Sequence, residues 1–130
     1  MKKVVVTGIG VVSCLGNNQE EIYQSLLNSK SGITFSEEYK EFNLKSHVHG
    51  VPNIKLEDYV DRKIIRFMGP GSAYNYIAMK EAVKDSGLEE KDVSNILTGM
   101  IMGSGGPSIK NVILAADKTR EKIQKKWALL

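Results

Sequence analysis

The stretch VVVTGIGVVSCLGNN, residues 4–18, opens with an apolar run that decides how the rest of the sequence is interpreted. Valine and isoleucine occur on both faces of an extended chain over residues 3–12, which predicts a central strand covered on both sides. Asn18 follows as an N-cap with Glu21 three residues later, so a helix is expected to begin there. The stretch also holds three glycines and the only cysteine, which raises two chemical possibilities.

The same kind of pattern continues outward along the chain. It predicts a short strand over residues 44–48, a short helix after Asp61, a longer helix between Pro70 and Gly87, a second apolar strand over residues 96–102, and a helix from residue 109 to the end. Strands and helices that alternate in this way predict an α/β protein with parallel strand pairing. We expect one domain, residues 1–130.

Composition and charge narrow the class of partner. The content of 42% hydrophobic and 25% charged residues is ordinary for a globular protein. Residues 109–130 hold six basic and two acidic residues, a net +4, which leaves −1 for the rest of the chain. We therefore expect no nucleic-acid partner. No apolar run approaches ~20 residues, and a single cysteine suits a reducing compartment, so we expect a cytoplasmic protein without a membrane partner.

The glycines do not make a good nucleotide-binding motif. Gly8 and Gly10 fit the dinucleotide pattern, but Ser13 stands where the third glycine belongs. Glycines that let a strand pack closely are the favoured interpretation, and we expect no cofactor. The later run GSGGPS, residues 103–108, lacks the lysine of a phosphate-binding loop, so it is either a tight turn or a glycine-lined ligand wall. A further hypothesis is that the chain is an unrelated α/β protein that binds a ligand through this loop.

Cys14 and the two histidines are weak candidates for chemistry. A cysteine nucleophile needs a base, and nothing in the sequence places His47 or His49 near Cys14. The two histidines could supply two metal ligands from one side of a strand, but no third ligand has a convincing spacing. We expect a structural cysteine and no metal site.

Arg62, Lys63 and Arg66 form the clearest charged cluster in the body of the chain. Arg62 and Arg66 lie four residues apart and so share one face of a helix. The pattern is typical of a solvated helix face, and a docking site for an anionic partner is the alternative.

Six blocks, taken together, carry a family resemblance: VVVTGIGVVSCLGNN, SLLNSKSGITF, SHVHG, VDRKIIRFMG, MKEAVKDSGL and IMGSGGPS. In this order and spacing the chain resembles the N-terminal part of a bacterial β-ketoacyl-acyl carrier protein synthase, closest to the type I form. The resemblance implies a partial thiolase-like fold, the N-terminal half of the condensing-enzyme core, with an incomplete sheet and its helices. It also implies decarboxylative condensation of malonyl-carrier protein with an acyl thioester in fatty acid biosynthesis.

The family's catalytic cysteine, two histidines and lysine would lie beyond residue 130. We therefore expect a truncated form that has no catalytic residue and is inactive alone. Cys14 falls where relatives carry a small residue such as serine. The alternative is a non-catalytic module that binds acyl carrier protein or a partner fragment.

Two family roles carry over to residues of this chain. Arg62, Lys63 and Arg66 match the basic patch that receives the acidic acyl carrier protein. Gly106 and Pro107 fall on the wall of the acyl pocket, where Pro107 replaces the usual glycine. Because both predicted strands would leave an apolar face open, we expect self-association or pairing with a complementary ketosynthase fragment.

Overall fold

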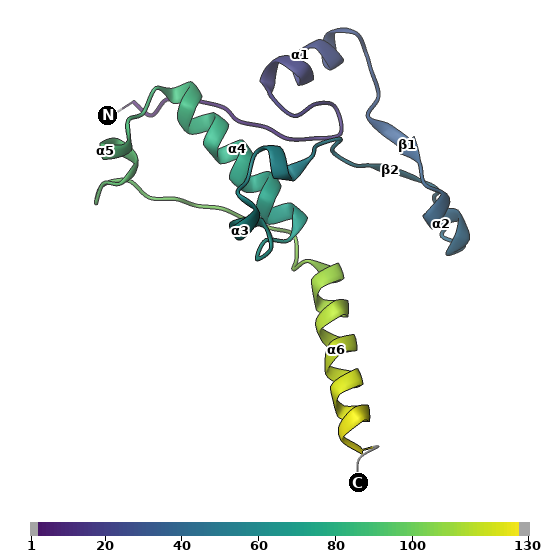
Figure 1. The fold of residues 1–130 in the computed structure, drawn as a ribbon. Helices are drawn as coiled ribbons and strands as arrows, with labels where there is room; N and C mark the ends of the chain where they lie inside the picture. The colour runs from purple at the N-terminus through teal and green to yellow at the C-terminus, as the bar shows by residue number, and fades with distance from the viewer. Residues whose placement is uncertain (1–2, 128–130) are drawn as a thin grey trace.

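The computed structural model describes residues 3–127, with helix α4 at the centre (Figure 1). The helices are α1 (Gln19–Leu27), α2 (Glu37–Glu41), α3 (Arg62–Ile65), α4 (Pro70–Ser86), α5 (Glu90–Val93) and α6 (Ile109–Trp127), and a 3-10 turn η1 spans Leu56–Asp58. The strands are β1 (Ile33–Phe35) and β2 (Val48–Gly50). The chain is therefore a mixed helix and strand structure, as predicted at this coarse level.

The strands β1 and β2 form a small antiparallel sheet. Ile33 lies opposite Gly50, and Phe35 lies opposite Val48. The Ser36 N–H donates to the carbonyl oxygen of His47 at 2.7 Å and extends the pairing by one residue. The predicted strand at 44–48 is thus displaced toward the C-terminus. The predicted parallel pairing is wrong for residues 3–127, where this antiparallel pair is the only sheet.

Residues 3–12 are extended but do not form the predicted strand. The backbone N–H groups of Ile9 and Val11 donate to the carboxylates of Asp85 and Glu81 on α4, at 2.9 Å each, and not to a neighbouring strand. The side chains of Val4, Val5 and Val6 are exposed to solvent, and that of Val4 is 96% exposed. A strand requires a partner backbone, and the described part of the chain offers none at this position.

The second predicted strand, residues 96–102, is also wrong. Its first residues form a turn, in which the Leu97 N–H donates to the Asn95 side chain at 2.9 Å and the Thr98 N–H donates to the Asn95 carbonyl at 2.9 Å. An asparagine side chain that binds the backbone two residues on offers an alternative to sheet pairing. The rest of the segment is extended, and Ile101 is 96% exposed.

The predicted starts of α1 and α4 and the predicted end of α4 are confirmed, and the C-terminal helix is confirmed over Ile109–Trp127, its last three predicted residues lying outside the described part of the chain. The Asn18 side chain accepts the Glu21 N–H at 3.0 Å, and the Glu21 carboxylate binds back to the N–H of Asn17 at 2.7 Å. Pro70 occupies the first turn of α4, where its missing N–H is harmless. Gly87 ends the helix with φ of 70°, a left-handed conformation that glycine adopts without strain.

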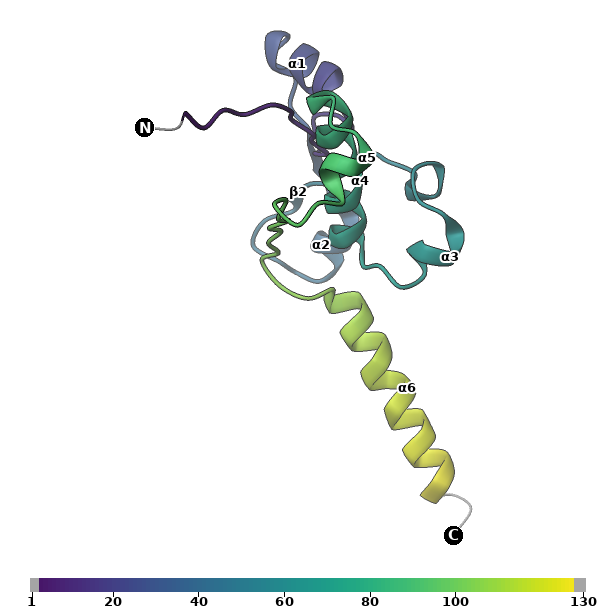
Figure 2. The ribbon, with the colours of Figure 1, turned by 90° about the vertical axis from the view of Figure 1, so that its left-hand side faces the viewer.

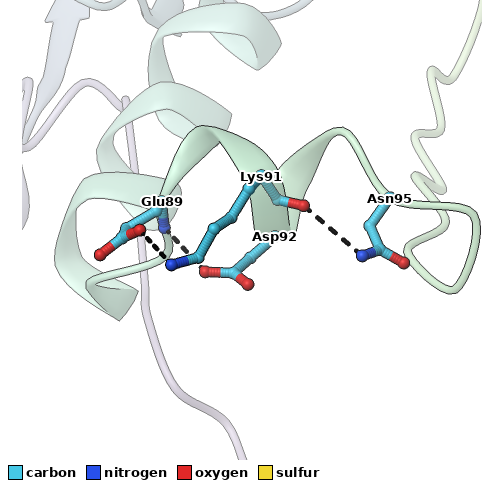
Figure 3. A network of polar contacts seen from close by, with 4 residues as sticks. All are labelled: Glu89, Lys91, Asp92 and Asn95. Atoms are coloured by element: carbon cyan, nitrogen blue, oxygen red, sulfur yellow. Dashed lines mark hydrogen bonds and ion pairs between the residues drawn. The ribbon is translucent and has the colours of Figure 1, made fainter.

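The short helix α5 is fixed by its own polar groups (Figure 3). The Glu89 N–H donates to Asp92 at 3.2 Å, and Lys91 forms an ion pair with Glu89 at 2.6 Å. Asn95 closes the end through a long bond to the Lys91 carbonyl, 3.5 Å. These groups are exposed, so the network defines the turn and contributes little to overall stability.

The buried apolar core is very small. Among the described residues only Val60, Ala73 and Ile77 are buried hydrophobic side chains. Helix α6 extends away from the body in both ribbon views (Figure 2). Its exposed large apolar side chains are Ile109, Val112, Ile113, Leu114 and Ile123. The accessible surface is 11366 Å², whereas a compact monomer of this mass exposes about 6,800 Å². The chain thus exposes about 4,500 Å² more surface than a compact monomer of the same mass.

Candidate functional site

The three predicted docking cations lie on and just after α3. Asp61 caps this helix, and its carboxylate accepts the Lys63 N–H at 2.6 Å. Arg66 is the C-cap and keeps helical backbone angles, so it stays one turn beyond Arg62 as the spacing predicted. All three cations are exposed, and no ion pair within the described part of the chain neutralises any of them.

An aromatic ring accompanies this cluster. The Arg66 guanidinium lies 4.7 Å from the centroid of the Phe67 ring, and that ring is 78% exposed. A cation over an aromatic face at this distance is attracted by the ring. The surface therefore combines three positive charges with an apolar side chain, a composition suited to an acidic partner that also presents an apolar contact. Sequence reasoning missed Phe67, although it follows Arg66 directly.

The two predicted acyl-pocket residues, Gly106 and Pro107, lie in the loop before α6. The Ser104 hydroxyl donates to the Gly106 carbonyl at 2.8 Å and closes a tight turn. A Cβ placed on Gly106 would meet no atom within 4 Å. No described neighbour therefore requires glycine at this position, and the role of Gly106 as a wall stays a prediction.

This loop borders a wide cleft between the first turns of α4 and α6. The cleft has a volume of about 720 Å³, and its lining includes Gly69, Ser72, Ser104, Gly106, Pro107 and Ser108. The residues just before the two helices, Gly69 and Ser108, lie close together: a Cβ placed on Gly69 would be only 2.7 Å from the Cβ of Ser108. Arg62, Lys63 and Arg66 do not line the cleft. The two predicted sets of functional residues are therefore separate.

Cys14 and the histidines occupy structural positions. Cys14 is a free thiol at the tight turn closed by Ser13 and Gly16, and it faces glycine backbones: a Cβ on Gly32 or Gly50 would lie within 2.9 Å of its sulfur. His47 packs edge-on against Phe35, and His49 packs in the same manner against Tyr39. Within residues 3–127 no three potential metal ligands gather.

Sequence reasoning missed the polar contacts between α4 and the N-terminal segment. Glu81 accepts the N–H groups of Val11 (2.9 Å) and Gln19 (3.1 Å). Asp85 accepts the N–H of Ile9, and this bond, with a smaller contribution from the Gln19 side chain, lowers the pKa of the Asp85 carboxyl. Two acidic residues four apart on one helix, opposite a Gly-x-Gly segment, are the signal that could have indicated the contact.

Comparison with known proteins identifies the family. The model of the β-ketoacyl synthase N-terminal domain matches residues 1–128. This chain belongs to the β-ketoacyl synthase family. The match covers the glycine-rich N-terminal segment, the basic cluster and the loop before α6, so the predicted family is confirmed.

The most similar relatives include synthases of the type that the sequence predicted. The chain is 44% identical to 3-oxoacyl-[acyl-carrier-protein] synthase 1 of Haemophilus influenzae and 45% identical to the protein of that name from Escherichia coli, over 92% of this chain in both cases. It is 30% identical to 3-oxoacyl-[acyl-carrier-protein] synthase 2 of Staphylococcus aureus over 93% of this chain. The chain spans 30% of the length of each of these relatives. Within residues 3–127 no helix is long and apolar enough to cross a bilayer.

Proposed function

We propose that this chain supplies the N-terminal part of a cytoplasmic 3-oxoacyl-acyl carrier protein synthase of fatty acid biosynthesis, with a thiolase-like fold that is completed by further polypeptide. One observation carries the proposal: residues 3–12 and 96–102 hold exposed apolar side chains, and neither segment has a strand partner among residues 3–127. Gly10, Ile101 and Met102 even line one hollow with Ala78 and Ala82 of that helix.

The proposed activity belongs to the completed assembly. By itself the chain does not catalyse condensation, because the nucleophilic cysteine, two histidines and lysine of the family have no counterpart in it. In the assembly, the chain contributes the carrier-docking cations and, at Gly106 and Pro107, part of the acyl-pocket wall.

A fragment-complementation assay tests this function. The chain is incubated with malonyl- and acyl-carrier protein, alone and with the remaining 70% of the Escherichia coli relative. We expect no 3-oxoacyl product from the chain alone and measurable product from the mixture. Product from the chain alone would contradict the proposal, as would a mixture no more active than the C-terminal part by itself.

A second candidate function is carrier-protein binding without catalysis. The exposed Arg62, Lys63 and Arg66 cluster beside Phe67 favours it. Surface charges of this kind steer an oppositely charged partner, and salt weakens the attraction. We expect saturable binding of acyl carrier protein at low salt, reduced at least about tenfold by Arg62→Glu with Arg66→Glu. The matched control, Lys118→Glu with Lys122→Glu on α6, changes net charge equally and should bind normally.

A further inference from the structure

The contact between the N-terminal segment and α4 has a regular geometry. Going from Ile9 to Val11 advances two residues along the extended chain, while the accepting carboxylate goes back four residues, from Asp85 to Glu81. Two extended residues span about 6.6–6.8 Å, and four helical residues rise about 6.0 Å. Because the two spacings nearly agree, both hydrogen bonds form without distorting either element.

The glycines enforce the same register. A Cβ on Gly10 would lie 1.8 Å from the Ala78 carbonyl oxygen, and a Cβ on Gly8 would lie 2.3 Å from that of Ala82. A slip of one residue would bring Ile9 against the helix backbone and turn the bonded N–H groups away from the carboxylates. Steric exclusion and hydrogen bonding therefore select one alignment.

The repulsion between the Glu81 and Asp85 carboxylates is offset by the hydrogen bonds that each of them accepts. Like charges four apart destabilise an isolated helix. Here the carboxylate of Glu81, on α4, accepts the N–H of Gln19 in the first turn of α1, where the dipole of α1 favours a negative charge. The Gln19 side-chain amide in turn donates to the Ile9 carbonyl and links the segment, α1 and α4.

We propose that Glu81 and Asp85 are positioning residues that set the register of residues 3–12 and thereby determine which backbone and apolar groups, chiefly those of residues 4–6, face an incoming strand. The partner is an apolar extended segment from the polypeptide that completes the condensing enzyme, so the inference rests on the proposed function. The exposed valines at residues 4–6 are the groups that such a strand would cover.

Amide hydrogen exchange on the whole chain, measured by NMR at neutral pH, tests the register alone. Glu81→Ala should speed exchange at Val11 and Gln19 about tenfold, and Asp85→Ala should do so at Ile9. Glu81→Gln and Asp85→Asn keep a carbonyl acceptor and should retain most of the protection. Glu121→Ala on α6 is the control and should leave these amides unchanged.

Unchanged exchange at Ile9 and Val11 in the alanine variants would overturn the proposal. In the alanine variants, a loss confined to Ile9, Val11 and Gln19 supports the proposal, and a loss shared equally by the α4 amides refutes it. If the alanine variants do not fold, Glu81→Gln and Asp85→Asn decide: a small loss confined to the same three amides supports the proposal, and unchanged exchange or a loss shared with the α4 amides refutes it. The complementation assay separates the two hypotheses, because failure to form product there leaves the exchange result intact. If both hold, Glu81→Ala should lower the yield of active assembly while Glu121→Ala does not.

Discussion

Single residues fix local packing in this chain even though the buried core is small. Gly10 is the clearest case, because it lets the N-terminal backbone lie directly on α4. Its neighbour Gly8 does the same one helical turn along. In both positions the advantage of glycine is the absence of a Cβ, since neither has a positive φ.

We predict that Gly10→Ala is destabilising by about 1–3 kcal/mol or more, because the new methyl group would overlap the Ala78 carbonyl. Gly99→Ala is the matched control, since a Cβ there meets no atom within 4 Å. Urea denaturation of both variants measures the difference. Equal midpoints for the two variants would show that the segment does not pack on α4 as described.

The lowered pKa of Asp85 predicts a pH dependence with a definite sign. A carboxyl whose folded pKa is below the unfolded value of 3.8 contributes stability that is fully present above that value and is lost as the pH falls through the folded pKa. Unfolding midpoints of the wild type and Asp85→Asn should therefore converge as the pH falls below about 3.8. Because the group is exposed, we expect a small effect. A gap between the two that widens on acidification would contradict the assignment.

At the scale of elements, the caps decide where helices begin. The Asn18 side chain that accepts the Glu21 N–H is the best example. We predict that Asn18→Ala lowers the free energy of unfolding by about 1 kcal/mol, whereas Asn18→Ser, which keeps an oxygen acceptor, costs only a few tenths. Circular dichroism during chemical denaturation measures both. A larger loss for serine than for alanine would exclude the capping role.

The sequence predicted the helices better than the strands, and the reason is physical. Asn18, Pro70 and Gly87 act within one helical turn, so local chemistry is enough to place α1 and α4. A strand is completed by a partner that can lie far away in the chain. Residues 3–12 carry every local mark of a strand, yet their N–H groups bind α4 because residues 3–127 offer no edge to pair with.

The candidate sites show the same contrast between features set by neighbouring residues and features that depend on distant ones. The i, i+4 relation of Arg62 and Arg66 is local and was predicted correctly, as was the exposure of that face. The contacts of Glu81 and Asp85 join residues about 70 positions apart. No pattern within either segment alone reveals them, and only their complementary spacings could have suggested the pair.

At the scale of the whole molecule, exposed surface is the dominant property. The excess of about 4,500 Å² on this one chain is larger than the roughly 1,000–2,500 Å² that each partner of an obligate interface typically buries. We predict that the isolated chain self-associates at tens of micromolar, through its bare extended segments or an exchange of α6. Size-exclusion chromatography with light scattering measures this. A well-dispersed monomer at that concentration would refute the prediction, and addition of the complementary ketosynthase part should replace self-association with a defined complex.

The turn and extended segment after Asn95 also make the chain easy to cut. Proteases bind their substrates as extended backbone, and exposed loops are preferred sites of nicking. Trypsin finds no lysine or arginine between Lys91 and Lys110, whereas chymotrypsin can cleave at Leu97 and Met100, which are both exposed. Brief chymotrypsin treatment should therefore release a C-terminal peptide containing α6, and a complementary polypeptide that covers this segment should slow its release. The rate of that one cleavage would then report how much of the enzyme has been assembled around the chain.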